Sequence, residues 1–403
     1  MAVHRYSTDR GDLTRTAILA LLGTVGPLSR TEIARRLTLS PATVTQLTRE
    51  LMGHGMLVEL ELERSKGGRP AQKLGLVGSA GRALGVKVMT DHIVIVDVRL
   101  DGEVLGSWER PIDTAAPTAL DDLADSVAAA VARTATEPGP PLLGIGVGVP
   151  GSVEDQAVGT VDAPTLGWRA VPVGQRLRRR LDLPVLVEND VNALAAAERL
   201  YGRGRTHGDF LVVTIGRGVG AAIVTDGRVY RGARGGAGEF GHVPVDAAGP
   251  VCGCGTTGCL EALVGASGLL ASARARGLTV TTVDELGRAA STGEEAAREV
   301  FAEAGAIFGR AAAGLINVVD PEVVVMLGEG TADWPFWNAG FERAIRAHLL
   351  PGRRDIAVEV EGWDDTSWAQ GAAALVLATP FDAAGAAGEQ GRLVRARLIG
   401  ATP

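Results

Sequence analysis

Apolar residues recur at three- and four-residue intervals in three segments near the start of the chain, residues 12–25, 31–37 and a third that starts at residue 42 and stops at Gly53 or Gly55. This spacing places the apolar side chains of each segment on one face, so each segment is predicted to form an amphipathic helix. Gly26-Pro27 separates the first helix from the second, and residues 38–41 separate the second from the third. Two short helices joined by a tight turn are typical of a helix-turn-helix.

Serine residues mark the starts of the second and third helices. Ser29 has Glu32 three positions further on, which is the capping-box pattern, and Ser40 is followed by Pro41, a residue favoured at the first helical position. Both helices are therefore predicted to begin with a side chain that accepts a hydrogen bond from a free backbone N–H group.

The third helix has an apolar face and a polar face. Val44, Leu47 and Leu51 share the inner face, and the residues at the helix start or on the outer face are candidates for DNA contact: Ser40, Thr43, Thr45, Gln46 and Arg49. Glutamine can pair with adenine and arginine with guanine in the major groove, and threonine can meet a thymine methyl group or a phosphate. The alternative is a three-helix protein-interaction domain.

An alternating strand at residues 56–63 leads into the basic segment RSKGGRPAQKLGL. We expect a β-wing with residues 65–70 at its tip, where the glycines let the backbone approach DNA. Lys66 and Arg69 suit phosphates or a narrow minor groove. Residues 1–78 are therefore predicted to form a winged helix-turn-helix DNA-binding domain.

Residues 79–403 contain one pattern twice. Two strands, a turn at Asp101-Gly102 and a third strand recur after a shift of 125 positions, with the second turn at Asp226-Gly227. Helices and apolar strands follow each copy, so we expect two similar α/β lobes facing a cleft. A helix at residues 367–381 is expected to close the fold, and the Gly- and Ala-rich tail after residue 382 is expected to be disordered.

Charge is distributed unevenly along the chain. The 403 residues have a net charge of −7, yet residues 1–78 hold 11 Lys and Arg against 7 Asp and Glu, a net +4 that leaves −11 for the remainder. A basic head on an acidic body is expected of a DNA-binding module fused to a second domain. No uninterrupted apolar run approaches the length of a membrane span, and the N-terminus lacks an apolar signal region, so a cytoplasmic protein is expected.

All three cysteines lie between positions 252 and 259. Cys252, Cys254 and Cys259 form C-x-C-x4-C, and His242 precedes them by ten residues, a set that can hold one Zn²⁺ in a closed tetrahedral site. Such a zinc is structural, because no position stays open for a catalytic water. The alternatives are three unpaired cysteines in a loop and a redox motif, although C-x-x-C is absent.

Several segments resemble the ROK family of repressors, open reading frames and kinases. They are GIGVGVPG (144–151), PTLGW (164–168), END (188–190), GRGVGAAIVTDG (216–227), E-x-G-H (239–242), CGCGTTGCLE (252–261) and NVVDPEVVVMLG (317–328). The resemblance covers essentially the whole chain. It implies a two-lobed α/β fold of the actin-like, hexokinase-like (RNase H-like) type around a sugar cleft, and the winged helix implies the transcription-factor branch.

The resemblance also implies a set of sugar-binding residues. Asn189 and Asp190 are expected to bind sugar hydroxyl groups, with Asp190 the general base in the family's kinases. Glu239 and Glu261 are expected to bind further hydroxyl groups, and His242 to bridge the zinc and the sugar. Asp190 could instead cap the helix that starts there, and either glutamate could be a surface carboxylate.

One hairpin departs from the family's kinases, which carry D-x-G-G-T there to hold phosphate and magnesium. Aligned on Gly85-Val86, this chain has a cation in place of the carboxylate and neither glycine: Lys87, Met89, Thr90 and Asp91. Lysine cannot anchor Mg²⁺, and the larger side chains block the close backbone approach of a phosphate cradle. We therefore expect a degenerate ATP site and no enzyme activity.

These features predict a sugar-responsive transcriptional regulator of carbohydrate metabolism genes. They favour a repressor over an activator. The winged helices of a homodimer or homotetramer are expected to bind operator DNA, and a sugar or sugar phosphate to alter the spacing of these heads. One alternative is an ATP-dependent hexose or N-acetylhexosamine kinase of the ROK family. Another is a regulator that answers to a protein partner such as a sugar-transport component.

Overall fold

The computed structural model describes residues 10–60, 72–136, 139–364, 366–381, 387–398 and 400. The chain divides into two compact units. Unit 1 comprises Met1–Thr206 and Thr366–Pro403, and unit 2 is the continuous segment His207–Asp365. Each unit has its own five-stranded sheet.

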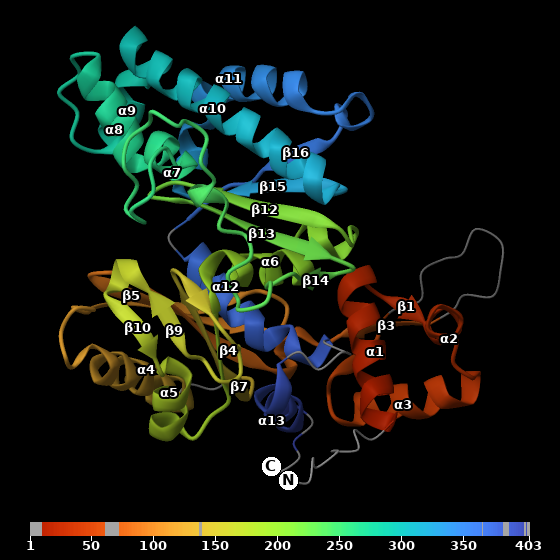
Figure 1. Cartoon of the computed structure of the whole chain (residues 1–403). Coiled ribbons are helices and arrows are strands. Elements are labelled where there is room, and N and C mark those ends of the chain that lie inside the picture. Colours follow the sequence, from red (N-terminus) through yellow and green to blue (C-terminus); the bar gives the residue numbers. More distant parts are fainter. Residues whose placement is uncertain are drawn as a thin grey trace. The chain divides into compact units, whose positions relative to one another are not determined.

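The N-terminal part of unit 1 is a helix-turn-helix followed by a β-hairpin (Figure 1). Its elements are α1 (Arg10–Val25), β1 (Leu28–Ser29), α2 (Arg30–Leu37), α3 (Pro41–Gly53), β2 (Leu57–Glu59) and β3 (Lys73–Leu76). The strands form an antiparallel sheet in the order β1-β3-β2. The predicted helices are confirmed. Of the strand predicted over 56–63, Leu57–Glu59 form β2, and residues 61–63 lie outside the described residues. The predicted wing tip, with Lys66 and Arg69, lies outside the described residues.

Both predicted helix caps are present in this region. The side chains and backbones of Ser29 and Glu32 form a complete capping box at the start of α2. At the start of α3, Ser40 Oγ accepts a hydrogen bond from the backbone N–H of Thr43 at 3.1 Å, and Pro41 occupies the first helical position. These local bonds fix where both helices of the helix-turn-helix begin.

The large sheet of unit 1 is covered by helices on both faces. Its order is β11-β7-β4-β5-β6, from β4 (Arg82–Val88), β5 (His92–Arg99), β6 (Val104–Pro111), β7 (Leu142–Val149) and β11 (Val185–Asn189). One core packs this sheet against α4 (Ala119–Thr136) and α5 (Val173–Leu181). The other packs it against α6 (Asp190–Leu200) and α12 (Ser367–Leu377). A small sheet joins β8 (Ser152–Val153), β9 (Val161–Ala163) and β10 (Trp168–Val171).

Unit 2 repeats this sheet. Its order is β16-β15-β12-β13-β14, from β12 (Phe210–Ile215), β13 (Val219–Thr225), β14 (Arg228–Val229), β15 (Val323–Leu327) and β16 (Ala357–Val360). In both sheets a three-stranded antiparallel meander is extended by two parallel strands. The predicted duplication is confirmed. The helices are α7 (Leu260–Val264), α8 (Ala266–Ala275), α9 (Val283–Ser291), α10 (Glu295–Val319) and α11 (Trp334–His348).

Helix α10 supplies much of the core of unit 2. Within the described residues it is the one helix long and apolar enough to cross a membrane by length and composition. Its Phe301 and Phe308 are fully buried, and the Phe308 ring centroid lies 5.6 Å from that of Phe341 on α11. These contacts account for its apolar composition, because they are those of a core helix.

The prediction that the tail after residue 382 is disordered is wrong for the last described segment. Residues Gly388–Leu398 form α13, which buries Val394 and Leu398. The side-chain oxygen of Gln390 accepts a hydrogen bond from the backbone N–H of Val185 on β11 at 3.1 Å. The tail is rich in small and charged residues, and the apolar face of this helix is only a few residues wide. The sequence pattern therefore does not indicate the helix.

Helix α12 packs backbone to backbone on the sheet of unit 1. A Cβ atom at Gly85 on β4 would overlap the carbonyl oxygen of Ala369, and one at Gly146 on β7 would overlap that of Ala372. The helix side of this contact is also built from small residues, all buried. Helix and strands therefore approach more closely than any larger side chain would allow.

Gly146→Ala is expected to lower the free energy of unfolding by about 2–3 kcal/mol, because the added methyl group must push α12 off the sheet. Gly148→Ala on the same strand is the matched control, since the nearest atom to its Cβ is the Ala372 Cβ at 3.6 Å. Denaturant unfolding followed by circular dichroism measures both. Equal stability of the two variants would contradict the packing described.

Candidate functional site

Helix α3 presents a polar surface of the kind that the sequence predicts for a recognition helix. Gln46 and Arg49 are exposed, whereas Val44, Leu47 and Leu51 are buried in the core. The inner and outer faces predicted from the sequence are therefore confirmed. An exposed glutamine and arginine on one helix face can reach base edges in a major groove.

The hydroxyl groups predicted for DNA contact are partly engaged at the start of α3. Ser40 Oγ and Thr43 Oγ1 share a hydrogen bond of 2.8 Å, and Thr45 Oγ1 donates to the carbonyl oxygen of Pro41 at 2.8 Å. These bonds give the three residues a structural role at the helix start.

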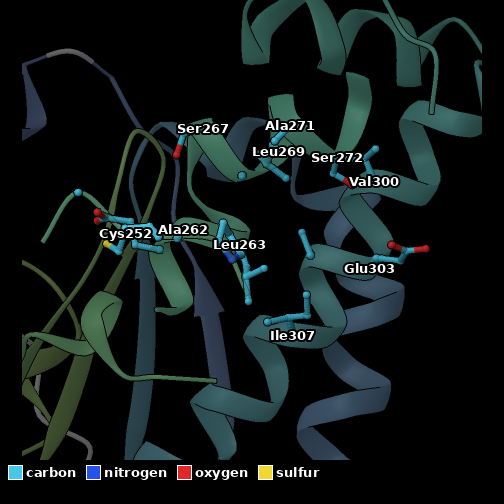
Figure 2. Close-up of a pocket in the computed structure, with 16 residues that line it drawn as sticks. Cys252, Ala262, Leu263, Ser267, Leu269, Ala271, Ser272, Val300, Glu303 and Ile307 are labelled. Carbon is cyan, nitrogen blue, oxygen red and sulfur yellow. The ribbon is translucent and has the colours of Figure 1, made fainter. Parts of the chain in front are cut away.

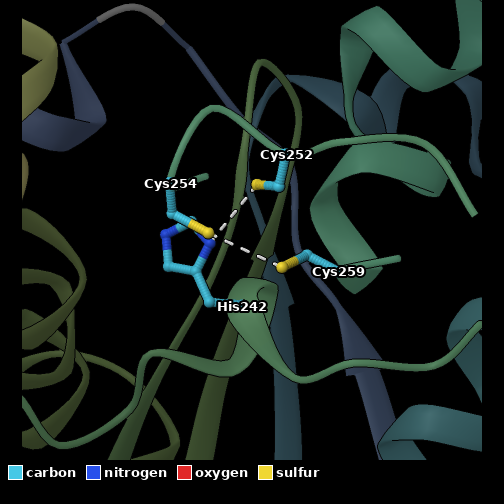
Figure 3. Close-up of side chains that lie close together, drawn as sticks. All are labelled: His242, Cys252, Cys254 and Cys259. Carbon is cyan, nitrogen blue, oxygen red and sulfur yellow. Dashed lines mark hydrogen bonds between the residues drawn. The ribbon is translucent and has the colours of Figure 1, made fainter. Parts of the chain in front are cut away.

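One histidine and three cysteines of unit 2 lie close together (Figure 3). One ligand atom from each of His242, Cys252, Cys254 and Cys259 lies within 4.8 Å of all the others. The Sγ atoms of Cys254 and Cys259 are 3.6 Å apart, and Cys252 Sγ is 3.6 Å from His242 Nδ1. The four residues predicted as metal ligands are thus brought together and could hold one metal ion.

The backbone of the cysteine loop turns back on itself twice. Cys252 donates its backbone N–H to the carbonyl oxygen of Thr256 at 2.8 Å, and Cys259 immediately precedes α7. Between them Gly258 has a φ of 71°, and a Cβ there would overlap the carbonyl oxygen of Asp246. The position therefore requires glycine, and this turn brings Cys259 back beside Cys254.

The thiols of this cluster have very different acidities. Hydrogen bonds from the backbone and side chain of Thr256 lower the pKa of Cys254 to about 6. Burial, followed by the neighbouring thiols, raises the pKa of Cys259 to about 12. Crowded thiols resist joint ionisation, and a cation at their common point removes that resistance.

The second nitrogen of His242 faces away from the cysteines. Its Nε2 lies 3.8 Å from an Oε2 of Glu239, and the two side chains are 38% and 50% exposed. Two of the residues predicted for sugar binding are therefore adjacent and accessible. A histidine that binds a metal through one nitrogen commonly directs the other to a carboxylate.

Glu261 is tied to the glycine-rich turn between β12 and β13. Its Oε2 accepts a hydrogen bond from the backbone N–H of Val219 at 3.0 Å, and it lies 2.6 Å from where a Cβ of Gly218 would stand. A Cβ at Gly216 would likewise overlap the carboxylate of Glu329. Two carboxylates therefore line a turn whose glycines resemble those of a phosphate-binding loop.

The unit 1 residues predicted for sugar binding stand at the junction of β11 and α6. Asn189, not Asp190, is the N-cap: its Oδ1 accepts from the backbone N–H groups of Val191 and Asn192, and its Nδ2 donates to Gly151. Asp190 Oδ1 also accepts from Val191 at 2.9 Å. The alternative assignment of Asp190 as the helix cap is therefore replaced by Asn189.

Asp190 forms a buried ion pair that the sequence does not reveal. Its Oδ2 pairs with Lys87 Nζ on β4, and the two side chains are only 13% and 7% exposed. The same ammonium group lies 4.9 Å from the ring centroid of Trp368 on α12. The sequence marks Lys87 as a departure from the kinase pattern, but its partner is 103 residues away.

A mainly apolar cavity of about 450 Å³ lies in unit 2 beside the metal-ligand cluster (Figure 2). Leu263, Leu269, Val300 and Ile307 contribute to its wall, and Cys252 and Glu261 stand at its edge. Glu239 and His242 do not line it. The cavity is therefore distinct from the His242–Glu239 pair and offers few partners for hydroxyl groups.

The chain is similar to two protein families over two separate ranges. A model described as the ROK family matches residues 83–379, and one described as the MarR family matches residues 12–64. A xylose repressor of Caldicellulosiruptor bescii is 32% identical over 314 residues, covering 74% of this chain and 78% of that protein. The DNA-binding transcriptional dual regulator NagC of Escherichia coli K12 is 28% identical, covering 90% and 92%.

Two solved structures extend this comparison. The crystal structure of a ROK family transcriptional regulator, a homologue of the E. coli MLC protein, has a TM-score of 0.81 at 25% identity, covering 97% of this chain and 99% of that one. A ROK family glucokinase of Streptomyces griseus in complex with glucose and AMPPNP has a TM-score of 0.63 at 28% identity, covering 73% and 99%.

The metal-ligand cluster predicts about one tightly held metal ion per purified chain. Cys254→Ser is expected to lower the metal content well below one and to reduce the melting temperature, because the exposed Cys254 side chain contributes a ligand but little packing. Thr257→Ser in the same loop is the control. Elemental analysis measures the metal, and a wild-type chain without metal at neutral pH would refute the site.

Proposed function

Because this chain belongs to the ROK family and carries a MarR-type winged helix at its N-terminus, we propose that it is a sugar-responsive repressor of carbohydrate metabolism genes. The observation that carries this proposal is the exposed Gln46 and Arg49 pair on α3. It stands at the head of a chain whose relatives, matched over most of their length, are named repressors or DNA-binding regulators. We assign residues 1–78 to DNA binding and 79–403 to sugar sensing, in the cytoplasm.

The DNA-binding head is proposed to work in pairs. Two heads of a homodimer or homotetramer place their α3 helices in successive major grooves of a palindromic operator. Gln46 and Arg49 read bases, and hydroxyl groups at the start of α3 with the basic wing contact phosphates: Ser40, Thr43, Thr45, Lys66 and Arg69.

The effector is proposed to be a sugar or sugar phosphate. We assign two residues of unit 1 and three of unit 2 to its hydroxyl groups: Asn189, Asp190, Glu239, His242 and Glu261. Each assignment rests on the contacts within the unit that carries the residue. Support comes from the carboxylate and imidazole chemistry, which suits vicinal hydroxyl groups. The alternative effector is a sugar-transport protein that acts in place of the sugar. In that case these residues would have no ligand.

The metal is proposed to be a structural Zn²⁺. Zn–S bonds of about 2.3 Å place two thiolates of a tetrahedral site about 3.7 Å apart. The 3.6 Å separation of Cys254 and Cys259 fits that geometry. His242 would bind Zn²⁺ through Nδ1, and the ion would fix the orientation of the ring, with Nε2 on the side of Glu239.

A sugar kinase is the second candidate, favoured by the retained Asp190 and by the glycines of the β12–β13 turn. Two arrangements of charged side chains oppose it. Lys87 is paired with Asp190, which the kinases use as a base, and Glu329 and Glu261 place negative charge at the turn that should cradle phosphates. We therefore propose that the ATP site is degenerate and that the chain is not an enzyme.

A coupled assay for ADP with glucose, xylose and N-acetylglucosamine is expected to show no sugar-dependent turnover, because phosphate and Mg²⁺ lack their cradle. A ROK glucokinase assayed in parallel with glucose is the positive control. Sustained turnover on any of the three sugars would establish the kinase and reject the assignment as a non-enzyme.

Arg49→Ala is expected to weaken binding to an operator selected from genomic fragments by about 5- to 150-fold, the range for loss of a specific base contact. Arg179→Ala on α5, also an exposed arginine, is the control with the same change of charge. Fluorescence anisotropy at fixed salt measures both affinities. Equal affinities of the two variants would reject α3 as the reading helix.

A further inference from the structure

The N-terminal end of α12 stands at the Lys87–Asp190 ion pair. Trp368 lies in the first turn of α12, and Lys87 Nζ is 4.9 Å from its ring centroid while paired with Asp190. Lys87 thus connects the carboxylate assigned to the sugar with the aromatic ring at the start of this helix. A buried cation shared by a carboxylate and an indole ring shifts when either partner changes.

Along its length α12 packs closely against the rest of unit 1. Ala369 and Ala372 contact β4 and β7 through their carbonyl oxygens, opposite Gly85 and Gly146. On its other side, the Cβ position of Gly371 is 3.0 Å from the backbone nitrogen of Leu194 on α6. Because α6 begins at Asp190, α12 is in direct backbone contact with the helix that carries this carboxylate.

The C-terminal end of α12 leads to the winged helix. The short helix η7 (Thr379–Phe381) continues α12, and Thr379 Oγ1 donates to the carbonyl oxygen of Leu375 at 3.0 Å. Phe381 is 7% exposed, and its ring lies 3.3 Å from where a Cβ of Gly23 on α1 would stand. Phe381 belongs to one hydrophobic core with the buried residues of α1.

We propose that α12 transmits sugar binding at Asp190 to the winged helix, with Lys87 and Trp368 as its input and Phe381 as its output. This inference rests on the proposed function. A sugar hydroxyl that donates to Asp190 competes with Lys87 for the carboxylate, and the ammonium group then moves relative to Trp368. Since the backbone contacts fix α12 to β4, β7 and α6, a shift at its N-terminal end moves these elements together, reaches the Phe381–Gly23 contact and changes the position of α1.

Thermodynamic linkage gives this proposal a reciprocal signature. If the sugar changes operator affinity by some factor, the operator changes sugar affinity by the same factor, typically 5- to 150-fold for coupled sites. A break in the transmitting element brings both factors towards one and leaves each affinity measured alone nearly unchanged. Loss of a binding site, in contrast, lowers one of the separate affinities.

The experiment uses the full chain and two variants at the output end. Phe381→Leu removes the ring from α1 with a small loss of volume, and Gly23→Ala adds a methyl group against that ring. Gly314→Ala on α10 is the control, since no atom lies within 4 Å of its Cβ. D-xylose, D-glucose and N-acetyl-D-glucosamine are tested, and the sugar that raises the melting temperature most is used. Anisotropy gives operator affinity with and without that sugar, and calorimetry gives sugar affinity with and without operator.

We expect the wild type and Gly314→Ala to show equal coupling factors of at least fivefold, and the other two variants to fall below twofold. Their separate affinities for operator and sugar should stay within about threefold of the wild type. Full coupling in both Phe381→Leu and Gly23→Ala would overturn the role of α12 and leave the proposed function standing. If none of the sugars changes the operator affinity of the wild type, the proposed function is overturned, and the inference with it.

Discussion

Unit 1 depends on the close approach of α12 to β4 and β7. Small residues on both sides let the helix backbone touch the strands, so its position is set by main-chain atoms and not by adjustable side chains. This contact places Trp368 over Lys87 at one end and leads to Phe381 under α1 at the other. Helix α6, which begins at Asp190, and the winged helix thus contribute buried residues to one hydrophobic core, although their sequence positions lie far apart.

Charge is used differently in the two units. In unit 1 the buried carboxylate of Asp190 is paired with Lys87 within the protein. In unit 2 two carboxylates crowd a glycine-rich turn, and one of them, Glu261, is bonded to the turn's own backbone. Both arrangements support the proposal that the ATP site is degenerate, because an ATP-dependent enzyme needs groups there that bind phosphate and Mg²⁺.

Local patterns carried most of the prediction from the sequence. The capping box at Ser29 and the cysteine spacing depend on residues close together in the chain, and the duplicated sheets are recognised from two local strand-and-turn patterns 125 positions apart. The failures concern distant or weak signals. Lys87 pairs with Asp190, which lies 103 residues further along the chain. Helix α13 is fixed by its contact with β11, and its own composition does not indicate that contact. Tertiary contacts of this kind have no short-range signature.

The division of the chain has a consequence for its synthesis on the ribosome. Unit 2 is one uninterrupted segment, so it can complete its fold as soon as residue 365 has emerged, whereas unit 1 is built from both ends of the chain. The packing of its sheet is incomplete until α12 has been synthesised, and the edge strand β11 lacks its hydrogen bond to Gln390 until α13 has been synthesised. Unit 1 therefore stays incomplete during synthesis while unit 2 folds. Premature termination before residue 367 leaves a DNA-binding head without the helix that supports it.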